Sequence, residues 1–321
     1  MLWGLVLFWA VGATGAYGYA QYRDIPTEMV LGLLPAFLLE ATLFLGFGLE
    51  RERTRLERLK PWTLALALTV AAVIPYSLAT LYLASFSWQS FAILALLAAV
   101  VSVWFIVLPH RVGPDLLFLA LVGVIAFSRL VRAQYPDLPR LPVGILGQMM
   151  WIRTAGCALL CIRQVRGVGF GFWPDARHWK IGALYFLGLI LVAIPAAWAV
   201  NFGVPHVPSG GWGRSPLLAL GTFFGILWVT ALGEEFLFRG LLQQWFSAWM
   251  KSDGAALLVT SLLFGAMHLW TPRNRFPDWQ LAPLAGLAGV FYGLAFRSAK
   301  SIRASMVTHA LTVTTWRLFF S

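Results

Sequence analysis

The sequence predicts an all-α protein, a polytopic bundle of about eleven transmembrane helices. Its 321 residues are 60% hydrophobic and only 12% charged, with a mean hydropathy of +0.76, whereas a soluble domain carries about twice that share of charge. Many runs reach the roughly 20 apolar residues that a membrane helix needs. These runs are too long and too uniformly apolar for barrel strands, and inside a bilayer only helices and closed barrels satisfy the backbone.

Eleven apolar segments follow one another along the chain. They cover about 2–20, 29–49, 61–84, 89–108, 115–133, 143–162, 181–201, 217–249, 254–271, 281–297 and 302–320. The stretch 163–180 is rich in glycine and charge and forms the clearest internal boundary. We therefore expect two regions, residues 1–180 with six spans of unassigned role and residues 181–321 with five spans.

Basic residues gather in alternate connections between the spans. If the N-terminus is cytoplasmic, the inside connections hold 15 Lys and Arg against 8 outside, and the stretch 51–60 accounts for much of the difference. This bias predicts a cytoplasmic N-terminus. We expect a multi-pass protein of a bacterial inner membrane, with membrane lipid as a partner. The net charge of +11 does not indicate nucleic-acid binding, because the chain has no basic, aromatic-bearing soluble domain.

Span eight contains a cluster of charge in an apolar run, where each charge costs about 2.5–3.5 kcal/mol on insertion scales. Glu234 and Glu235 are adjacent, and Arg239 follows four residues after Glu235. Neighbouring residues on a helix point about 100° apart, whereas a Glu-to-Arg spacing of four favours an ion pair. We expect Glu235 and Arg239 to pair structurally, which leaves Glu234 free to act as a general base.

Two of the five histidines, His268 and His309, also lie in apolar spans. Glu234 and His268 lie at similar depth, because both are more than ~20 Å from the turn at residues 251–254 at a rise of ~1.5 Å per residue. His309 lies only about seven residues, roughly 10 Å, into span eleven. Either the turn at 251–254 projects past the membrane, or span eleven starts deeper than its apolar run indicates.

A second buried ion pair is expected in the first region. Glu40 in span two and Arg153 in span six are both charged residues within apolar segments. Such residues pair with one another far more often than they stand alone. We expect them to pair across the N-terminal bundle in a structural role.

The polar residues of the last spans resemble the motifs of a known family. Glu234-Glu235-Phe236-Leu237-Phe238-Arg239 matches a motif E-E-x-x-x-R, Phe264 and His268 match F-x-x-x-H, and His309 matches a later intramembrane histidine. This pattern is similar to the CAAX-protease and bacteriocin-processing (CPBP, or Abi) family of intramembrane glutamic endopeptidases. The resemblance covers about residues 181–321.

The resemblance implies peptide hydrolysis by an activated water. Glu234 would be the general base, His268 would help to orient the water, and His309 would stabilise the oxyanion, while Glu235, Arg239 and Phe264 would support the site. No cofactor is implied, and the expected partner is a membrane-anchored protein or peptide: a prenylated C-terminus, a leader peptide or a C-terminal sorting anchor. The sequence departs from the pattern at Val313, where the family often has asparagine or another polar residue.

Two other functions stay open. Glu234, His268 and His309 could supply a zinc site with two histidines and one glutamate, although the chain has no H-E-x-x-H motif. A non-catalytic membrane protein, such as an immunity or scaffolding factor, is the other alternative, because Val313 offers no hydrogen bond.

Overall fold

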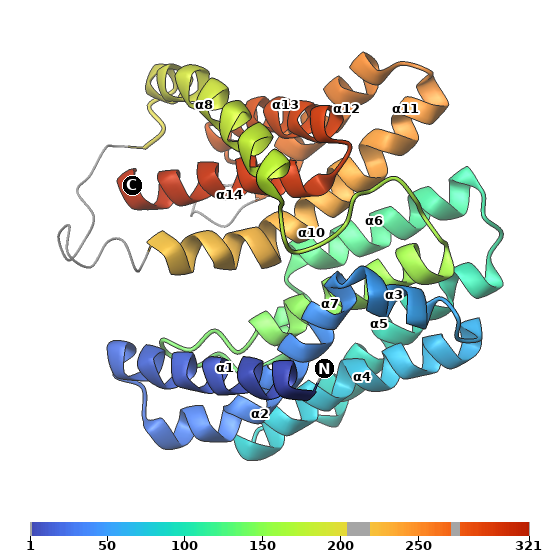
Figure 1. Ribbon diagram of the computed structural model, residues 1–321, viewed down its shortest axis with the longest axis vertical. Coiled ribbons are helices and arrows are strands. Elements are labelled where there is room, and N and C mark those ends of the chain that lie inside the picture. Colours follow the sequence, from blue (N-terminus) through green and yellow to red (C-terminus); the bar gives the residue numbers. More distant parts are fainter. Residues whose placement is uncertain (1, 204–218, 271–276, 321) are drawn as a thin grey trace. The chain divides into compact units, whose positions relative to one another are not determined.

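The computed structural model describes residues 2–203, 219–270 and 277–320, which form two compact units (Figure 1). The first unit is Met1–Val165. Its helices are α1 (Leu2–Arg23), α2 (Thr27–Gly48), α3 (Glu50–Leu56), α4 (Pro61–Tyr82), α5 (Trp88–Val107), α6 (Val112–Ser128), the 3₁₀ turn η1 (Arg132–Gln134), α7 (Ile145–Cys157) and the π-helical turn η2 (Ala158–Ile162).

The second unit is Arg166–Ser321. Its helices are α8 (Ala176–Ala199), a continuous helix over Ala219–Met250, α12 (Asp253–Met267), the 3₁₀ turn η5 (His268–Trp270), α13 (Leu281–Ala299) and α14 (Ile302–Phe319). The break between the units lies within the charged stretch 163–180.

The all-α prediction is confirmed, because the described residues contain helices and no strand. Each of the eleven apolar segments is largely helical. Seven helices are long and apolar enough to cross a membrane, and α6 and α12 are shorter apolar helices. The protein is therefore an integral multi-pass membrane protein. The number of spans is not fixed at eleven, since α1 and α14 are not among those seven.

The first unit is built around the predicted ion pair. Arg153 on α7 donates from Nε and Nη2 to the two carboxylate oxygens of Glu40 on α2, at 3.0 and 3.1 Å, and both side chains are buried. Arg153 also donates to the carbonyl oxygen of Ala71 on α4. The expected pairing is confirmed, and it joins three helices of this unit.

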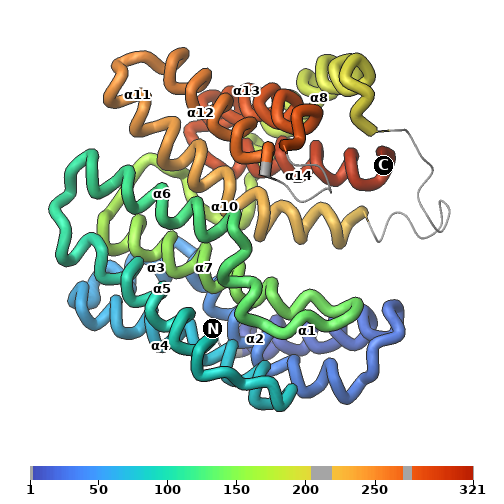
Figure 2. Tube along the Cα trace, turned by 180° about the vertical axis from the view of Figure 1, so that it is seen from behind, coloured from blue at the N-terminus to red at the C-terminus, as the bar shows by residue number. Residues whose placement is uncertain are grey.

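In the second unit, α12 and α13 pack along one another, and α8 packs against both α13 and α14 (Figure 2). Small residues permit the close approach of α12 to α13. A side chain at Gly265 would meet the carbonyl oxygen of Ala282 at 2.7 Å and the Cα of Gly286 at 3.1 Å. Small residues of this kind let membrane helices approach closely when lipid gives no hydrophobic drive between them.

The long helix over Ala219–Met250 is not a regular α-helix. Two π-helical stretches, η3 (Ile226–Ala231) and η4 (Phe236–Gln243), flank the short α10 (Leu232–Glu235), and α11 (Gln244–Met250) completes it. π-Helical turns are rare and occur frequently at functional sites. They flank the short α-helical turn that contains both Glu234 and Glu235.

The structure also explains the shallow position of His309 in the sequence. The start of α14 is covered by residues 168–170 of the connecting stretch, because Ile302 donates from its backbone N–H to the Val168 carbonyl and Ser301 donates to the Gly169 carbonyl. Ile302 is fully buried and Ser301 is nearly so. Thus α14 begins inside the second unit, covered by residues 168–170. This agrees with the alternative in which span eleven starts deeper than its apolar run indicates.

Candidate active site

Glu235 and Arg239 form the predicted ion pair. Arg239 Nη1 donates to Glu235 Oε1 at 3.0 Å, and neither side chain is exposed. The spacing of four residues places them on one face even though η4 is π-helical. A buried charge is tolerated where an opposite charge pairs with it. We therefore interpret the Glu235–Arg239 pair as structural.

The rest of the Arg239 guanidinium is also held in place. Nη2 donates to the carbonyl oxygen of Gly289 on α13 at 3.0 Å. Its central carbon lies 4.5 Å from the ring centre of Phe264 and 5.2 Å from that of Tyr292. Aromatic faces attract a guanidinium. Arg239 therefore connects the long helix to α12 and α13.

His309 on α14 completes this network. Its Nδ1 lies 2.8 Å from Glu235 Oε1, the same oxygen that accepts from Arg239. Tyr292 stacks on the imidazole, with ring centres 4.7 Å apart and planes inclined by 14°. A carboxylate paired with arginine only accepts hydrogen bonds, so we assign the proton to Nδ1. Nε2 is then directed at Glu234, whose Oε2 lies 3.9 Å away.

His268 is held in a similar way. It follows α12 directly, and its Nδ1 lies 2.7 Å from the carbonyl oxygen of Phe264 one turn earlier. A carbonyl oxygen accepts, which again places the proton on Nδ1 and makes Nε2 the acceptor nitrogen of the ring. Phe264 itself is fully buried and packs edge-on against the ring of Phe238.

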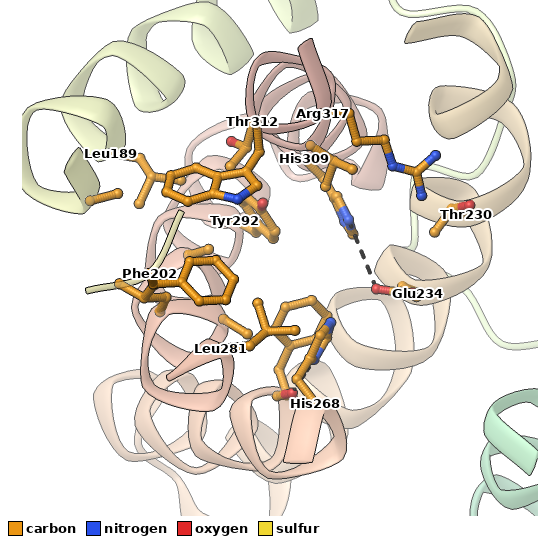
Figure 3. Close-up of a pocket in the computed structure, with 17 residues that line it drawn as sticks. Leu189, Phe202, Thr230, Glu234, His268, Leu281, Tyr292, His309, Thr312 and Arg317 are labelled. Carbon is orange, nitrogen blue, oxygen red and sulfur yellow. Dashed lines mark hydrogen bonds and ion pairs between the residues drawn. The ribbon is translucent and has the colours of Figure 1, made fainter. Parts of the chain in front are cut away.

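Glu234, His268 and His309 line one cavity of about 280 Å³, which Phe264 also lines (Figure 3). In Figure 3 the Glu234 carboxylate lies between the two imidazoles, with the ion-pair distance drawn to His309. The walls are largely apolar: Leu189, Ala193, Phe202, Leu281, Leu284, Ala285, Ala288, Val313 and Trp316. Glu235 and Arg239 lie behind this cavity, with no exposed surface.

Glu234 is the acid that differs from its neighbour. Its Oε2 is buried and has no hydrogen-bond partner among the described residues, yet the side chain as a whole is 21% exposed. A buried carboxylate oxygen without a donor is costly. Because Glu234 lines the cavity, this oxygen is placed to accept a hydrogen bond from a water or a substrate there.

Sequence reasoning missed several polar residues of the cavity. They are Thr230, Tyr292, Thr312 and Arg317. Tyr292 alone carried a signal, as a tyrosine in the middle of an apolar span. Thr312 and Val313 are neighbours on α14, and both line the cavity. The Thr312 hydroxyl donates to the Thr308 carbonyl at 2.7 Å, so it presents an acceptor to the cavity.

The alternative of a zinc site requires Glu234, His268 and His309 to be placed as metal ligands. Among residues 2–203, 219–270 and 277–320, no group of three or more His, Cys, Asp or Glu side chains is arranged to hold a metal ion. Glu234, His268 and His309 share a cavity but do not form such a group.

Comparison with known proteins connects this geometry to a family. Residues 216–315 match the family model described as Type II CAAX prenyl endopeptidase Rce1-like. The match contains every motif residue from Glu234 to His309, and the resemblance to the CAAX protease family is confirmed over this range. No curated protein matches the chain, and no solved structure does.

Proposed function

We propose that residues 216–315, which match an endopeptidase family, form the catalytic part of an intramembrane endopeptidase of the glutamic type. One observation carries the proposal. Glu234 presents a buried, unpartnered carboxylate oxygen to a cavity that two oriented histidines share. Two hydrogen-bond acceptors, the Glu234 carboxylate and His268 Nε2, are suited to hold a water molecule by its two protons.

In the proposed reaction Glu234 takes a proton from that water, whose oxygen bonds to the carbonyl carbon of the scissile peptide. His268 orients the water through Nε2. The proton then passes from Glu234 to the amide nitrogen, and the C–N bond breaks to give a carboxylate and an amine. General-base catalysis of this kind contributes about 10²–10⁴-fold.

The oxyanion of the tetrahedral intermediate needs a donor, and Val313 supplies none. His309 fills this role once it has taken a second proton from solvent, before the water is attacked: Nε2 then donates to the oxyanion, while Nδ1 keeps its hydrogen bond to Glu235. The negative charge of Glu235 then stabilises the positively charged imidazolium of His309. When His309 is neutral, Glu235 is paired with the positive charge of Arg239. Preorganised donors of this type contribute several kcal/mol to acyl-transfer reactions.

The expected substrate is a peptide bond in a membrane-anchored protein or peptide. The apolar cavity walls support a substrate segment that lies within or beside the bilayer. The exposed leucines of α8, Leu184, Leu187 and Leu191, are suited to contact with lipid.

The test is a cleavage assay with the purified chain in lipid vesicles. The substrates are quenched fluorescent reporters of three classes: a prenylated C-terminus, a leader peptide and a C-terminal membrane anchor. Glu234→Gln should lower kcat at least 100-fold, while Asp253→Asn, a matched change outside the cavity, should keep the wild-type rate. Mass spectrometry in ¹⁸O-labelled water should find the label in the new carboxylate. Cleavage by Glu234→Gln at the wild-type rate would overturn the assignment of the base.

A further inference from the structure

The second unit has two distinguishable ends. At one end, Nη2 of Arg297 on α13 lies 3.4 Å from Oδ2 of Asp253 at the start of α12. At the same end, Arg177 of α8 donates a hydrogen bond to the Ser298 carbonyl, and the Tyr185 hydroxyl forms one with the Ser298 hydroxyl. We call this the basic end. It contains the starts of α8, α12 and α14 and the ends of α11 and α13.

Contacts at the opposite end are equally clear. Gln280, just before α13, donates to the Val200 carbonyl after α8, and Phe202 stacks on Trp316 in the last turns of α14. Asp278 donates from its backbone N–H to the carbonyl of Leu269, after α12. We call this the cavity end, because its residues include several that line the cavity.

The cavity belongs to one half of the unit only. On the long helix it is lined by Thr230 and Glu234 but by nothing beyond them toward the basic end. On α12 and α13 the lining residues nearest the basic end are Phe264 and Tyr292, and on α14 the nearest is His309. From these residues the lining extends to Phe202, Leu281 and Arg317 at the cavity end.

The half toward the basic end is filled. Glu235 and Arg239 lie there with no exposed surface, and so do Met306 and Val307 on α14. The stretch 168–170 additionally covers the start of α14 through its hydrogen bonds to Ser301, Ile302 and Arg303. The cavity lining therefore leads from Glu234 toward the cavity end, where Arg317 is exposed, and not toward the basic end.

The charges of the unit assign its ends to the two sides of a membrane. Seven of its lysines and arginines lie at or near the basic end: Arg166, Arg177, Lys180, Lys251, Arg297, Lys300 and Arg303. Among the described residues of the unit, Arg317 is the basic residue at the cavity end. Lysine and arginine are in excess in cytoplasmic connections. The basic end is thus the cytoplasmic one.

From these two observations we propose that the catalytic cavity opens to the extracytoplasmic side of the membrane. This inference rests on the proposed function and narrows its substrate. The substrate is a membrane-anchored polypeptide whose cleaved bond has already crossed the membrane, such as an exported protein's anchor or leader, and not a lipid-modified tail on the cytoplasmic side.

Cysteine labelling tests the orientation without any need for activity. Arg317→Cys places a thiol at the cavity end, Lys300→Cys places one at the basic end, and both positions are exposed. The two native cysteines are buried, so the unchanged chain measures the background. In whole cells a membrane-impermeant maleimide should label Arg317→Cys and not Lys300→Cys, and inverted membrane vesicles should show the reverse. The opposite pattern, or equal labelling of both thiols from one side, would overturn the proposal.

Paired reporters then test the substrate in cells. Each carries one peptide beside one anchor helix, displayed either outside or in the cytoplasm, and each is expressed with the wild-type chain and with Glu234→Gln. We expect wild-type cleavage of the outward reporter only, at least 10-fold above the variant. Cleavage of the cytoplasmic reporter alone would overturn the present inference but leave the protease function. Cleavage of neither, with the expected labelling, would count against the protease function alone.

Discussion

His309 Nδ1 and the Arg239 guanidinium both contact a single oxygen, Oε1 of Glu235. This carboxylate thereby joins α14 to the long helix, and it fixes which nitrogen of His309 is directed at Glu234. Glu235 is therefore the ion-pair partner of Arg239 and also the group that positions His309, the histidine that we propose to be catalytic. We therefore expect substitution of Glu235 to lower both stability and activity, and substitution of Glu234 to lower activity without a comparable loss of stability.

The first prediction uses that difference. Glu235→Gln leaves the buried arginine without a counter-charge, which should lower the free energy of unfolding by about 3–5 kcal/mol. Glu234→Gln, whose side chain is partly exposed in the cavity, should change the thermal midpoint by less than about 2 °C. Thermal unfolding of both variants in detergent measures this. Equal destabilisation by the two changes would contradict the division of roles.

Sequence alone predicted the division of the two glutamates, because a spacing of four residues is a local property of a helix. It did not predict the second contact of Glu235, since that depends on how α14 packs. Depth estimates along the spans aligned Glu234 with His268, and both residues do line one cavity, but those estimates left His309 too shallow to join them, whereas it lies 3.9 Å from Glu234. The estimate assumed that span eleven begins at the membrane surface, but α14 begins beneath residues 168–170.

Arg239→Lys gives the second prediction. Lysine carries the charge but has no planar fork, so it cannot donate to Glu235 and Gly289 in the same way while facing Phe264 and Tyr292. We expect a lower thermal midpoint and at least a 10-fold loss of kcat. Arg297→Lys, at an exposed ion pair, is the matched control and should change neither. A fully active Arg239→Lys protein would show that charge alone suffices.

Tyr292 provides the third prediction, through its stacking on His309. Tyr292→Phe keeps the ring and should retain at least half of the activity. Tyr292→Leu removes the ring–ring contact, worth about 0.5–1.5 kcal/mol, and should reduce kcat by about 3–10-fold as the imidazole loses its orientation. Reporter cleavage at saturating substrate distinguishes the two variants. The hydroxyl would be the important group if both lost activity equally.

Gly265→Ala should destabilise the second unit. The new methyl group would lie 2.7 Å from a backbone oxygen of Ala282, and backbone atoms cannot yield as a flexible side chain can. Gly254→Ala in the same helix has open space around it and should be neutral or slightly stabilising, because alanine favours a helix by up to about 1 kcal/mol. The two thermal midpoints provide the comparison, and equal midpoints would show that α12 can move away from α13.

The last prediction concerns Glu40 and Arg153, the buried pair of the first unit. Glu40→Met and Arg153→Met each leave one buried charge alone and should each lower the free energy of unfolding by about 3–5 kcal/mol. Replacing both by Met removes both charges, so the double variant should be more stable than either single one, as expected when a buried pair is exchanged for apolar residues. Unfolding of the four proteins, including wild type, completes a double-mutant cycle. A double variant that lost as much as the two single losses added together would show that the residues act independently, against the coupling that their 3.0 Å contact implies.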